Sequence, residues 1–311
     1  MRKAESKGRI MSKTFEETVK GGRLTFQACG RQAHVVSGRV LEPYLEIPDE
    51  IHGLVVTGIE KKAMLGSRAL REAALPAQLC EIGDWAFASC RQLEKVWIPR
   101  RQIRFGRGVF KGCGNLLQIP FREEENQALS EKVSGLLAMA PVMLEAEYLL
   151  SPMEAGEEVW LEKLDARLEI LLDRPDAEGY SRQVLCGEED LMASLDLYLE
   201  ERRRQKARLC YRRLLNDYGL GKGLSERLEV FLRENTKGCA YQAAWEVAFR
   251  EHGSRRAYYE VFARAGCITE ENFPQLLADM GERYPEMKAW LMRYREEKMR
   301  RADFFAGLSL D

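Results

Sequence analysis

The sequence has few of the residues from which common active sites are built. Only three histidines occur in 311 residues, His34, His52 and His252, and they lie far apart in the chain. None of the eight cysteines belongs to a C-x-x-C pair of the kind that structural zinc sites use. No segment gives G-x-S-x-G, H-E-x-x-H or a phosphate-binding glycine loop in the context each motif needs. We therefore expect no catalytic residue, no metal site and no cofactor.

Long apolar runs are also missing. No stretch approaches the roughly 18 consecutive apolar residues of a membrane span, and no apolar run of a secretory signal follows the charged N-terminus. The net charge of -1 gives no overall field that would attract nucleic acid or a membrane. We expect a cytoplasmic protein in which the cysteines are free thiols that act as small buried apolar residues.

An internal repeat is the clearest positive feature. Residues 59–76, 82–99 and 105–121 align at a spacing of 23, and each apolar position recurs in the same column. The columns include Met64, Phe87 and Phe110; Leu70, Leu93 and Leu116; and the small residues Ser67, Cys90 and Cys113. One unit of this length cannot enclose its own apolar face, so neighbouring units must stack into a shared core.

The second unit carries a family resemblance. Residues 82–99 reproduce the pattern I-G-x-x-A-F-x-x-C-x-x-L-x-x-V-x-I-P, which resembles the leucine-rich repeat of the bacterial BspA type, also called the Treponema type. Residues 22–122 are similar to this family, with a hairpin-like N-terminal cap at Leu24–Phe26 and Ala33–Val36. Met64 and Ser67 depart from the pattern in the first unit, as do Phe105 and Val109 in the third. The resemblance implies a right-handed solenoid that binds other macromolecules, and it brings no catalytic residues.

Each repeat predicts a short strand with one outward face. In residues 95–98, alternation points Val96 and Ile98 inward and Lys95 and Trp97 outward. In register, the candidate partner-binding residues are Tyr44, Glu46, Glu72, Lys95, Trp97 and Gln118. A tryptophan on a solvent-facing strand is typical of an anchor for a partner. The alternative is that the helical half of the chain covers it.

A basic rim follows that strand. It consists of Arg100, Arg101, Arg104, Arg107 and Lys111. Residues 1–124 contain 21 Lys and Arg against 14 Asp and Glu, a net of +7, and residues 125–311 contain 27 against 35, a net of -8. The rim could bind phosphates, dock on the acidic half or be a solvated edge, and a charge run is most often solvated.

After residue 122 the strand pattern gives way to helical spacing. Leu161, Leu164, Leu168 and Leu171 form one apolar stripe, and further stripes predict helices near 191–214, 228–232, 241–249, 258–262, 273–280 and 287–294. Gly219, Gly253 and Gly281 are expected to end helices as left-handed caps, and Thr269 to begin one. The array is faintly similar to ankyrin-type helical hairpins, although the T-P-L-H signature is absent.

Arginine and lysine recur along residues 202–213. A nucleic-acid-binding helix has this composition, and so does a solvated face whose aliphatic stems cover neighbouring side chains. Glu200 and Glu201 just before the run favour the second interpretation.

We predict an α+β chain: a flexible N-terminus at 1–21, a leucine-rich-repeat domain at 22–122 and an all-α array of helical hairpins at 123–311. The predicted function is non-catalytic binding of another protein through the sheet face of the repeats. Two alternatives stay open: nucleic-acid or phosphate binding through the basic rim, and an enzyme with an unrecognised site in the helical half. The sequence does not identify the partner or the oligomeric state.

Overall fold

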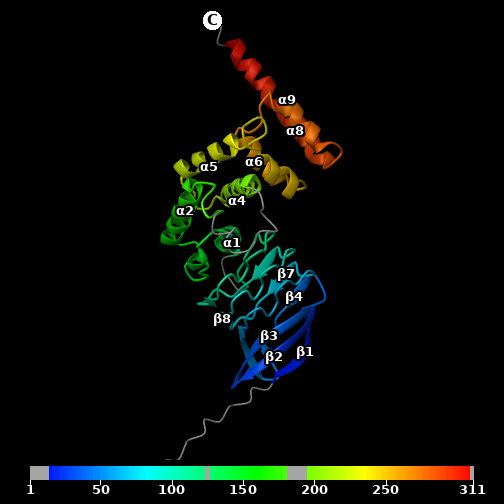
Figure 1. Cartoon of the computed structure of the whole chain (residues 1–311), viewed down its shortest axis with the longest axis vertical. Coiled ribbons are helices and arrows are strands. Elements are labelled where there is room, and N and C mark those ends of the chain that lie inside the picture. The colour runs from blue at the N-terminus through cyan, green and yellow to red at the C-terminus, as the bar shows by residue number, and fades with distance from the viewer. Residues whose placement is uncertain (1–13, 123–126, 181–194, 309–311) are drawn as a thin grey trace, which may run out of the picture. The chain divides into compact units, whose positions relative to one another are not determined.

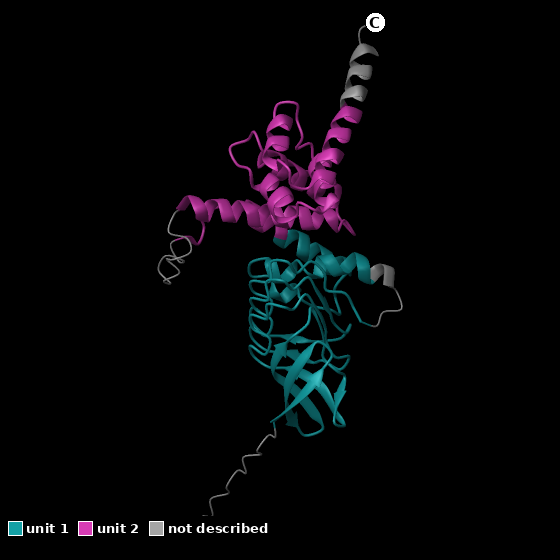
Figure 2. Ribbon diagram, turned by 90° about the vertical axis from the view of Figure 1, so that its right-hand side faces the viewer, with its two compact units in different colours: residues 1–167 teal, residues 168–311 magenta. Residues whose placement is uncertain are grey.

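The computed structural model describes residues 14–122, 127–180 and 195–308. The chain divides into two compact units, residues 1–167 and 168–311 (Figure 2). A β-solenoid of about three turns forms the N-terminal half, and the C-terminal half is helical. The division lies inside α2 (Glu158–Asp173), well beyond residue 122, where the sequence pattern changes. No helix in the described ranges combines the length and the apolar composition needed to cross a membrane.

An antiparallel hairpin pair opens the first unit (Figure 1). β1 (Thr14–Val19) pairs with β2 (Gly22–Cys29), and β2 pairs with β3 (Gln32–Val40). Leu24, Phe26 and Val35 point into the core and are fully buried, as the period-two alternation requires. The expectation of a flexible segment at 1–21 is wrong for residues 14–21, because β1 and the following turn bond to β2 along the strand. Residues 1–13 lie outside the described ranges.

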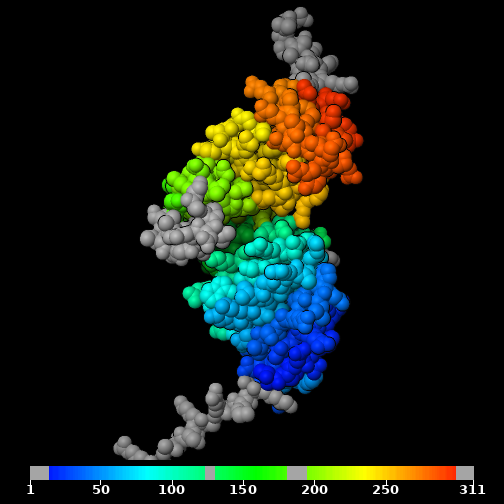
Figure 3. Space-filling view, turned by 45° about the vertical axis from the view of Figure 1, so that its right-hand side comes forward, coloured from blue at the N-terminus to red at the C-terminus, as the bar shows by residue number. Residues whose placement is uncertain are grey.

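The repeats build two sheets from short strands. The strands are β4 (Tyr44–Glu46), β5 (Glu50–Ile51), β6 (Leu54–Ile59), β7 (Glu72–Ala74), β8 (Glu81–Ile82), β9 (Lys95–Trp97) and β10 (Arg104–Phe105). The three-stranded sheet has the order β4-β7-β9, and all its pairs are parallel. The other sheet has the order β1-β2-β3-β6-β8-β10, with β5 paired to β6. In the space-filling view the hairpin residues, in blue, continue without a break into the first repeats, in lighter blue (Figure 3).

The predicted columns form the core between the two sheets. Met64, Phe87 and Phe110 are at most 2% exposed, and the rings of Phe87 and Phe110 stack with centroids 5.7 Å apart. The leucine column is fully buried in all three units, and so are Cys90 and, at 1% exposure, Cys113. The Cys90 thiol donates a hydrogen bond to the backbone carbonyl of Met64, and the Cys113 thiol to that of Phe87. Each acceptor lies 26 residues earlier in the chain, in the preceding turn of the solenoid. Ser67 in the first unit is only half-buried, and its hydroxyl bonds within its own turn.

The wall opposite the three-stranded sheet is made of consecutive tight turns. Amides bond three residues back, as from Ala88 to the carbonyl of Trp85. A left-handed residue interrupts each unit at the same position, namely Lys62, Trp85 and Gly108, with φ between 54° and 61°. A helix cannot continue through that conformation. Figure 2 shows these turns stacked along one side of the first unit.

Helices cover the last repeat. α1 (Gln127–Leu137) buries Val133, Leu136 and Leu137. Its Ser134 carbonyl accepts a bond from the amide of Ile119, and its Ser130 hydroxyl accepts one from the amide of Phe121. The short helices η1 (Ala140–Val142) and η2 (Glu147–Leu149) follow. α1 therefore satisfies backbone donors at the open end of the solenoid, where no further strand is present.

The second unit is helical throughout its described ranges. Its helices are α4 (Leu195–Leu215), α5 (Lys222–Glu234), α6 (Ala243–Glu246), the π-helix η3 (Val247–Glu251), α7 (Arg256–Arg264), α8 (Phe273–Met280) and α9 (Pro285–Leu308). Each helix that the sequence predicts after residue 194 corresponds to one of these helices. The expected start of the first of these at Leu191 lies outside the described ranges.

None of the three glycines is a left-handed helix cap. Gly219 has a positive φ of 65° but follows the end of α4 at Leu215 by four residues. Gly281 does end α8, but it combines a φ of 52° with a ψ of -123°, which lies outside the left-handed helical region. Gly253 does not adopt a left-handed conformation; instead, a Cβ at this position would lie 2.1 Å from the Tyr284 ring. The glycine is therefore required for close packing and not for a helix cap. Thr269 and Asn272 exchange hydrogen bonds between their side chains and amides just before α8, which confirms the predicted helix start to within one turn.

Candidate functional site

The residues proposed for partner binding lie together on one face of the β4-β7-β9 sheet. The strand register places Tyr44 opposite Glu72, Glu72 opposite Lys95, and Lys95 opposite Gln118 in a single row. A second row contains Glu46, Ala74 and Trp97. Side chains in the same row share a face. The structure thus brings all six residues together in the arrangement that the 23-residue spacing predicts.

This sheet face is partly exposed and chemically mixed. All six proposed residues are half-buried or exposed, whereas Ala74 between Glu46 and Trp97 is only 4% exposed. The ammonium group of Lys95 lies 5.4 Å from the centroid of the Trp97 ring. The face therefore presents an aromatic surface next to both signs of charge.

The other edge of the face is ordered by the first hairpin. The Tyr44 hydroxyl donates to Glu46 at 3.3 Å, and Lys20 lies 3.4 Å from the same carboxylate and 4.7 Å from the Tyr44 ring centroid. Burial and the Glu46 carboxylate raise the pKa of Tyr44. Gly21 makes this contact possible, because any Cβ there would overlap the Tyr44 carbonyl oxygen. Tyr44 thus remains a neutral hydrogen-bonding group in its place on the face.

The preceding turn of the solenoid pairs two of the five rim cations with carboxylates. Arg104 pairs with Glu81, and Arg107 with Asp84, each 23 residues earlier in the chain. The Arg107 amide also donates to Asp84 at 2.8 Å and holds the pKa of that carboxyl below its usual range. Arg101 bonds to the Ala77 carbonyl and to Gln78. The remaining rim residues are Arg100, whose guanidinium lies over the Phe121 ring, and the exposed Lys111.

Sequence reasoning missed a second aromatic position. Trp85, on the wall of turns, lies within 6 Å of the charged groups of Lys61, Lys62 and Arg107. Its ring packs over Gly108, where a Cβ would lie 2.9 Å away. The sequence did contain a signal for this residue. The positions equivalent to Trp85 in the neighbouring repeats are a lysine and a glycine, so the tryptophan is not needed to build the repeat. Trp85 is half-buried and forms a cation–π cluster.

The basic helix α4 is held by acidic partners within its own unit. Arg203 and Lys206 bind Asp176 at 2.9 and 2.8 Å. Arg208 binds Glu201 and Glu251 at 2.7 and 2.6 Å, and these partners raise the pKa of its guanidinium against the effect of burial. Ion-paired, partly buried arginines are not arranged like those of a phosphate-binding face, which must leave them free.

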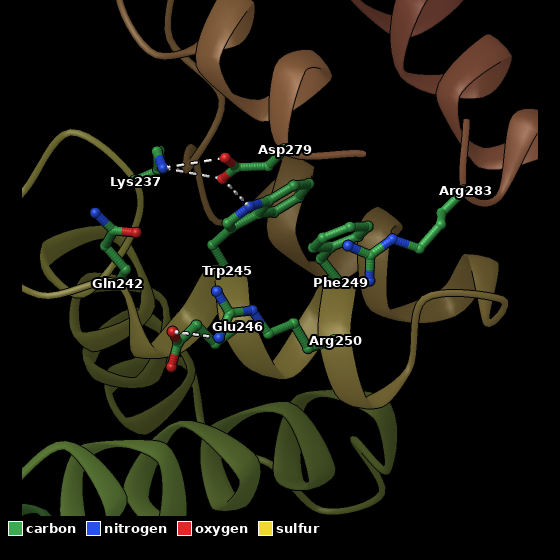
Figure 4. A pocket seen from close by; sticks show the side chains of 8 residues that line it. All are labelled: Lys237, Gln242, Trp245, Glu246, Phe249, Arg250, Asp279 and Arg283. Atoms are coloured by element: carbon green, nitrogen blue, oxygen red, sulfur yellow. Dashed lines mark hydrogen bonds and ion pairs between the residues drawn. The ribbon is translucent and has the colours of Figure 1, made fainter. Parts of the chain in front are cut away.

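A polar cavity of about 230 Å³ lies within the second unit (Figure 4). Lys237 and the indole N–H of Trp245 both bind Asp279 at 3.0 Å, and Arg250 binds Glu246 at 3.3 Å. The other lining residues are Gln242, Phe249 and Arg283, whose guanidinium lies over the Phe249 ring. The set lining this cavity contains no serine, cysteine or histidine, and its carboxylates are already engaged. Its ionisable groups Lys237, Asp279, Glu246 and Arg250 are held in ion pairs with one another.

The cysteines are free thiols in every described case, but they are not all buried. Cys90, Cys113, Cys210 and Cys267 are buried, and burial raises the pKa of the last two. Cys29, Cys80 and Cys239 are exposed, which corrects the expectation of buried thiols at those positions. Cys186 lies outside the described ranges.

Comparison with known proteins supports the repeat assignment. The family model for the BspA type leucine rich repeat region matches residues 45–133 in six copies. A leucine-rich repeat protein from Bacteroides capillosus is 24% identical over 32% of this chain and 78% of its own, with a TM-score of 0.29. A leucine rich cell surface protein from Faecalibacterium prausnitzii is 23% identical over 33% of this chain, with a TM-score of 0.29, and a T. pallidum leucine rich repeat protein is 22% identical over 33%, with a TM-score of 0.27.

The chain spans 29% and 59% of the latter two proteins. The comparison with curated proteins found no match. The residues that match the BspA-type leucine rich repeat model, 45–133, include the stacked columns and nearly all of the β4-β7-β9 sheet.

Proposed function

We propose that this chain is a non-catalytic interaction module that binds another protein through the exposed face of the β4-β7-β9 sheet. The observation that carries the proposal is the placement of Trp97 on that face, beside the small Ala74 and under the Lys95 ammonium group. Leucine-rich repeats commonly mediate protein interactions. A partly exposed tryptophan within a mixed polar rim is the composition of an interface anchor.

Competing functions have less support from the described residues. Arg104 and Arg107 of the rim and Arg203 of α4 are paired with carboxylates, which lowers the positive charge available to a nucleic acid. The lysine and the carboxylates that line the cavity of the second unit are engaged in ion pairs. A cytoplasmic location stays a prediction from the N-terminal sequence.

The test compares two tryptophans of the same repeat. Trp97→Ala removes the anchor on the sheet face, and Trp85→Ala removes an equally large side chain from the wall of turns. A photo-crosslinking amino acid at Gln118, in the same row as Lys95, first identifies the partner. The affinity of that partner is then measured by calorimetry for both variants.

We expect Trp97→Ala to weaken binding about 30-fold, the equivalent of a hot-spot loss of about 2 kcal/mol. Lys95→Glu should weaken it further, since it reverses the charge beside the indole. Trp85→Ala should leave the affinity unchanged. Equal affinity of the Trp97→Ala variant and the original protein for every crosslinked partner would exclude this face as the binding site.

A further inference from the structure

A histidine and two glutamates from three neighbouring strands meet on the seven-stranded sheet. His34 lies in β3, Glu81 in β8, and Glu60 directly follows β6. The Nδ1 atom of His34 is 2.8 Å from Oε1 of Glu60 and 3.6 Å from Oε1 of Glu81. One potential ligand atom from each residue lies within 4.8 Å of the other two. All three side chains are partly exposed, so an ion could reach them from solvent.

The local backbone explains why these side chains converge. The register places His34 opposite Gly58 and Gly58 opposite Glu81, in one row across three parallel strands. A Cβ at Gly58 would lie 2.8 Å from the imidazole ring, so the glycine leaves the space in which the ring lies across β6. The β3–β6 register also shifts between Ala33 and His34. Such irregularities redirect side chains and are common beside functional sites.

The charges at this cluster suit a dication. Glu60 has no lysine or arginine partner among the residues that the structure describes, and its carboxylate faces only the imidazole. Glu81 uses Oε2 to bind Arg104 and turns Oε1 toward His34. A neutral imidazole with two carboxylates carries two negative charges, and the Arg104 guanidinium offsets one of them, so the cluster keeps a net negative charge that attracts a divalent ion.

We propose that His34, Glu60 and Glu81 form a binding site for a divalent transition-metal ion of the zinc class. Nδ1 of His34 and one oxygen from each carboxylate would be the ligands. Imidazole nitrogen and carboxylate oxygen are both ligands that zinc accepts, and three protein ligands leave a coordination position for water or a partner's side chain. Ligand atoms around tetrahedral zinc are about 3.4 Å apart. The two distances from His34 are 2.8 and 3.6 Å and the third pair of ligand atoms lies within 4.8 Å, so the side chains must move to bring all three onto one ion.

This site is independent of the proposed protein interface. It lies on the seven-stranded sheet, whereas Trp97 belongs to the three-stranded sheet. The spacing gave no sign of it, because the three ligands are 21 and 26 residues apart in sequence and only the register unites them. The expectation of no metal site came from the rarity of histidine and the lack of C-x-x-C pairs, and it did not consider such a cluster.

The experiment uses the full chain, treated with EDTA, dialysed and titrated with Co²⁺ as a coloured substitute for Zn²⁺. We expect one equivalent to bind with visible d–d absorption, without the near-ultraviolet sulfur-to-metal bands that cysteine ligands would produce, and Zn²⁺ to displace it. Loss of an outer-shell partner of a metal ligand typically costs 10–100-fold in affinity. Glu60→Gln and Glu81→Gln, which remove a ligand charge and keep the shape, should each weaken binding at least about tenfold.

Two further variants separate ligand loss from misfolding. His52→Gln removes an exposed histidine that also pairs with a glutamate, Glu17, on the same sheet, and it should leave the affinity unchanged. Gly58→Ala changes no ligand but displaces the His34 ring, so it should weaken Co²⁺ binding. The thermal melting temperature of each metal-free variant shows that the fold is retained. Absence of saturable binding, bands from sulfur ligands only, or equal affinity in both glutamine variants and the original protein would overturn the proposal.

Discussion

His252 provides a quantitative test of the packing in the second unit. It directly follows η3, is 8% exposed, and stacks on Tyr258 with ring centroids 3.9 Å apart. Burial, together with the positive charges of Arg255, Arg212 and Arg208, lowers the pKa of its imidazole to about 3. The ring is therefore neutral in the folded protein at any ordinary pH.

The sign and size of the effect follow from proton linkage. The imidazole of the unfolded chain titrates near pH 6.5, so between about pH 6.5 and 3 the unfolded state binds a proton that the folded state excludes. Stability is fully present above pH 6.5 and is lost as the pH falls toward 3. At 1.36 kcal/mol per pH unit within this window, lowering the pH from 8 to 5 should remove about 2 kcal/mol of unfolding free energy.

The assay compares the original protein with His252→Phe, which keeps a stacked ring and cannot titrate. Urea unfolding is followed by circular dichroism at pH 8, 6.5 and 5, and the difference between the two proteins cancels the titration of distant carboxylates. We expect the variant to gain about 2 kcal/mol relative to the original protein on going from pH 8 to pH 5. His52→Gln, at a histidine that is 59% exposed, should parallel the original protein. Identical pH dependence of the original protein and His252→Phe would refute the argument.

Two further predictions concern stability. Phe87→Ala should lower the free energy of unfolding by about 3–5 kcal/mol in urea titrations, because it empties the centre of the solenoid column. As a control, Leu65→Ala in the same wall, at a residue 48% exposed, should change this free energy by less than about 0.5 kcal/mol. Equal effects of the two substitutions would contradict the stacked-column core. Asp176→Asn should lower the free energy of unfolding by about 2–3 kcal/mol, because two largely buried cations lose their charged partner. Glu226→Gln, in an exposed ion pair, should lower it by less than about 0.5 kcal/mol. A negligible loss of stability for Asp176→Asn would show that the Asp176 ion pairs do not support the helices.

The repeat could be predicted from the sequence because its information is local and periodic. A column such as Met64, Phe87 and Phe110 recurs at one spacing, so a single rule assigns the core, the strand and the outward face of every unit. The same rule correctly placed Tyr44, Glu72 and Lys95 in one row. Helices of the second unit were also recognisable, because apolar residues at three- and four-residue spacing indicate a buried helix face.

The features that sequence reasoning missed depend on contacts between distant or irregular segments. β1 pairs with β2, but its residues alternate between exposed and half-buried, and none of them is fully buried. A strand of this kind leaves only a weak apolar alternation in the sequence. The His34 cluster needs a register shift that no local pattern encodes. Gly253 packs against Tyr284 from another segment, and a glycine selected for packing has the same sequence signal as a glycine selected for a cap.

The period of the solenoid also determines which charges remain available for binding. A residue meets its counterpart 23 positions away, so Arg71 pairs with Glu94, Arg104 with Glu81 and Arg107 with Asp84. The net charge of +7 in residues 1–124 is therefore a poor guide to a binding surface. Trp97 has no such charged counterpart, because the equivalent positions in the neighbouring turns are the smaller residues Ala74 and Pro120. Specificity in the repeats should consequently depend on Trp97 more than on the basic rim.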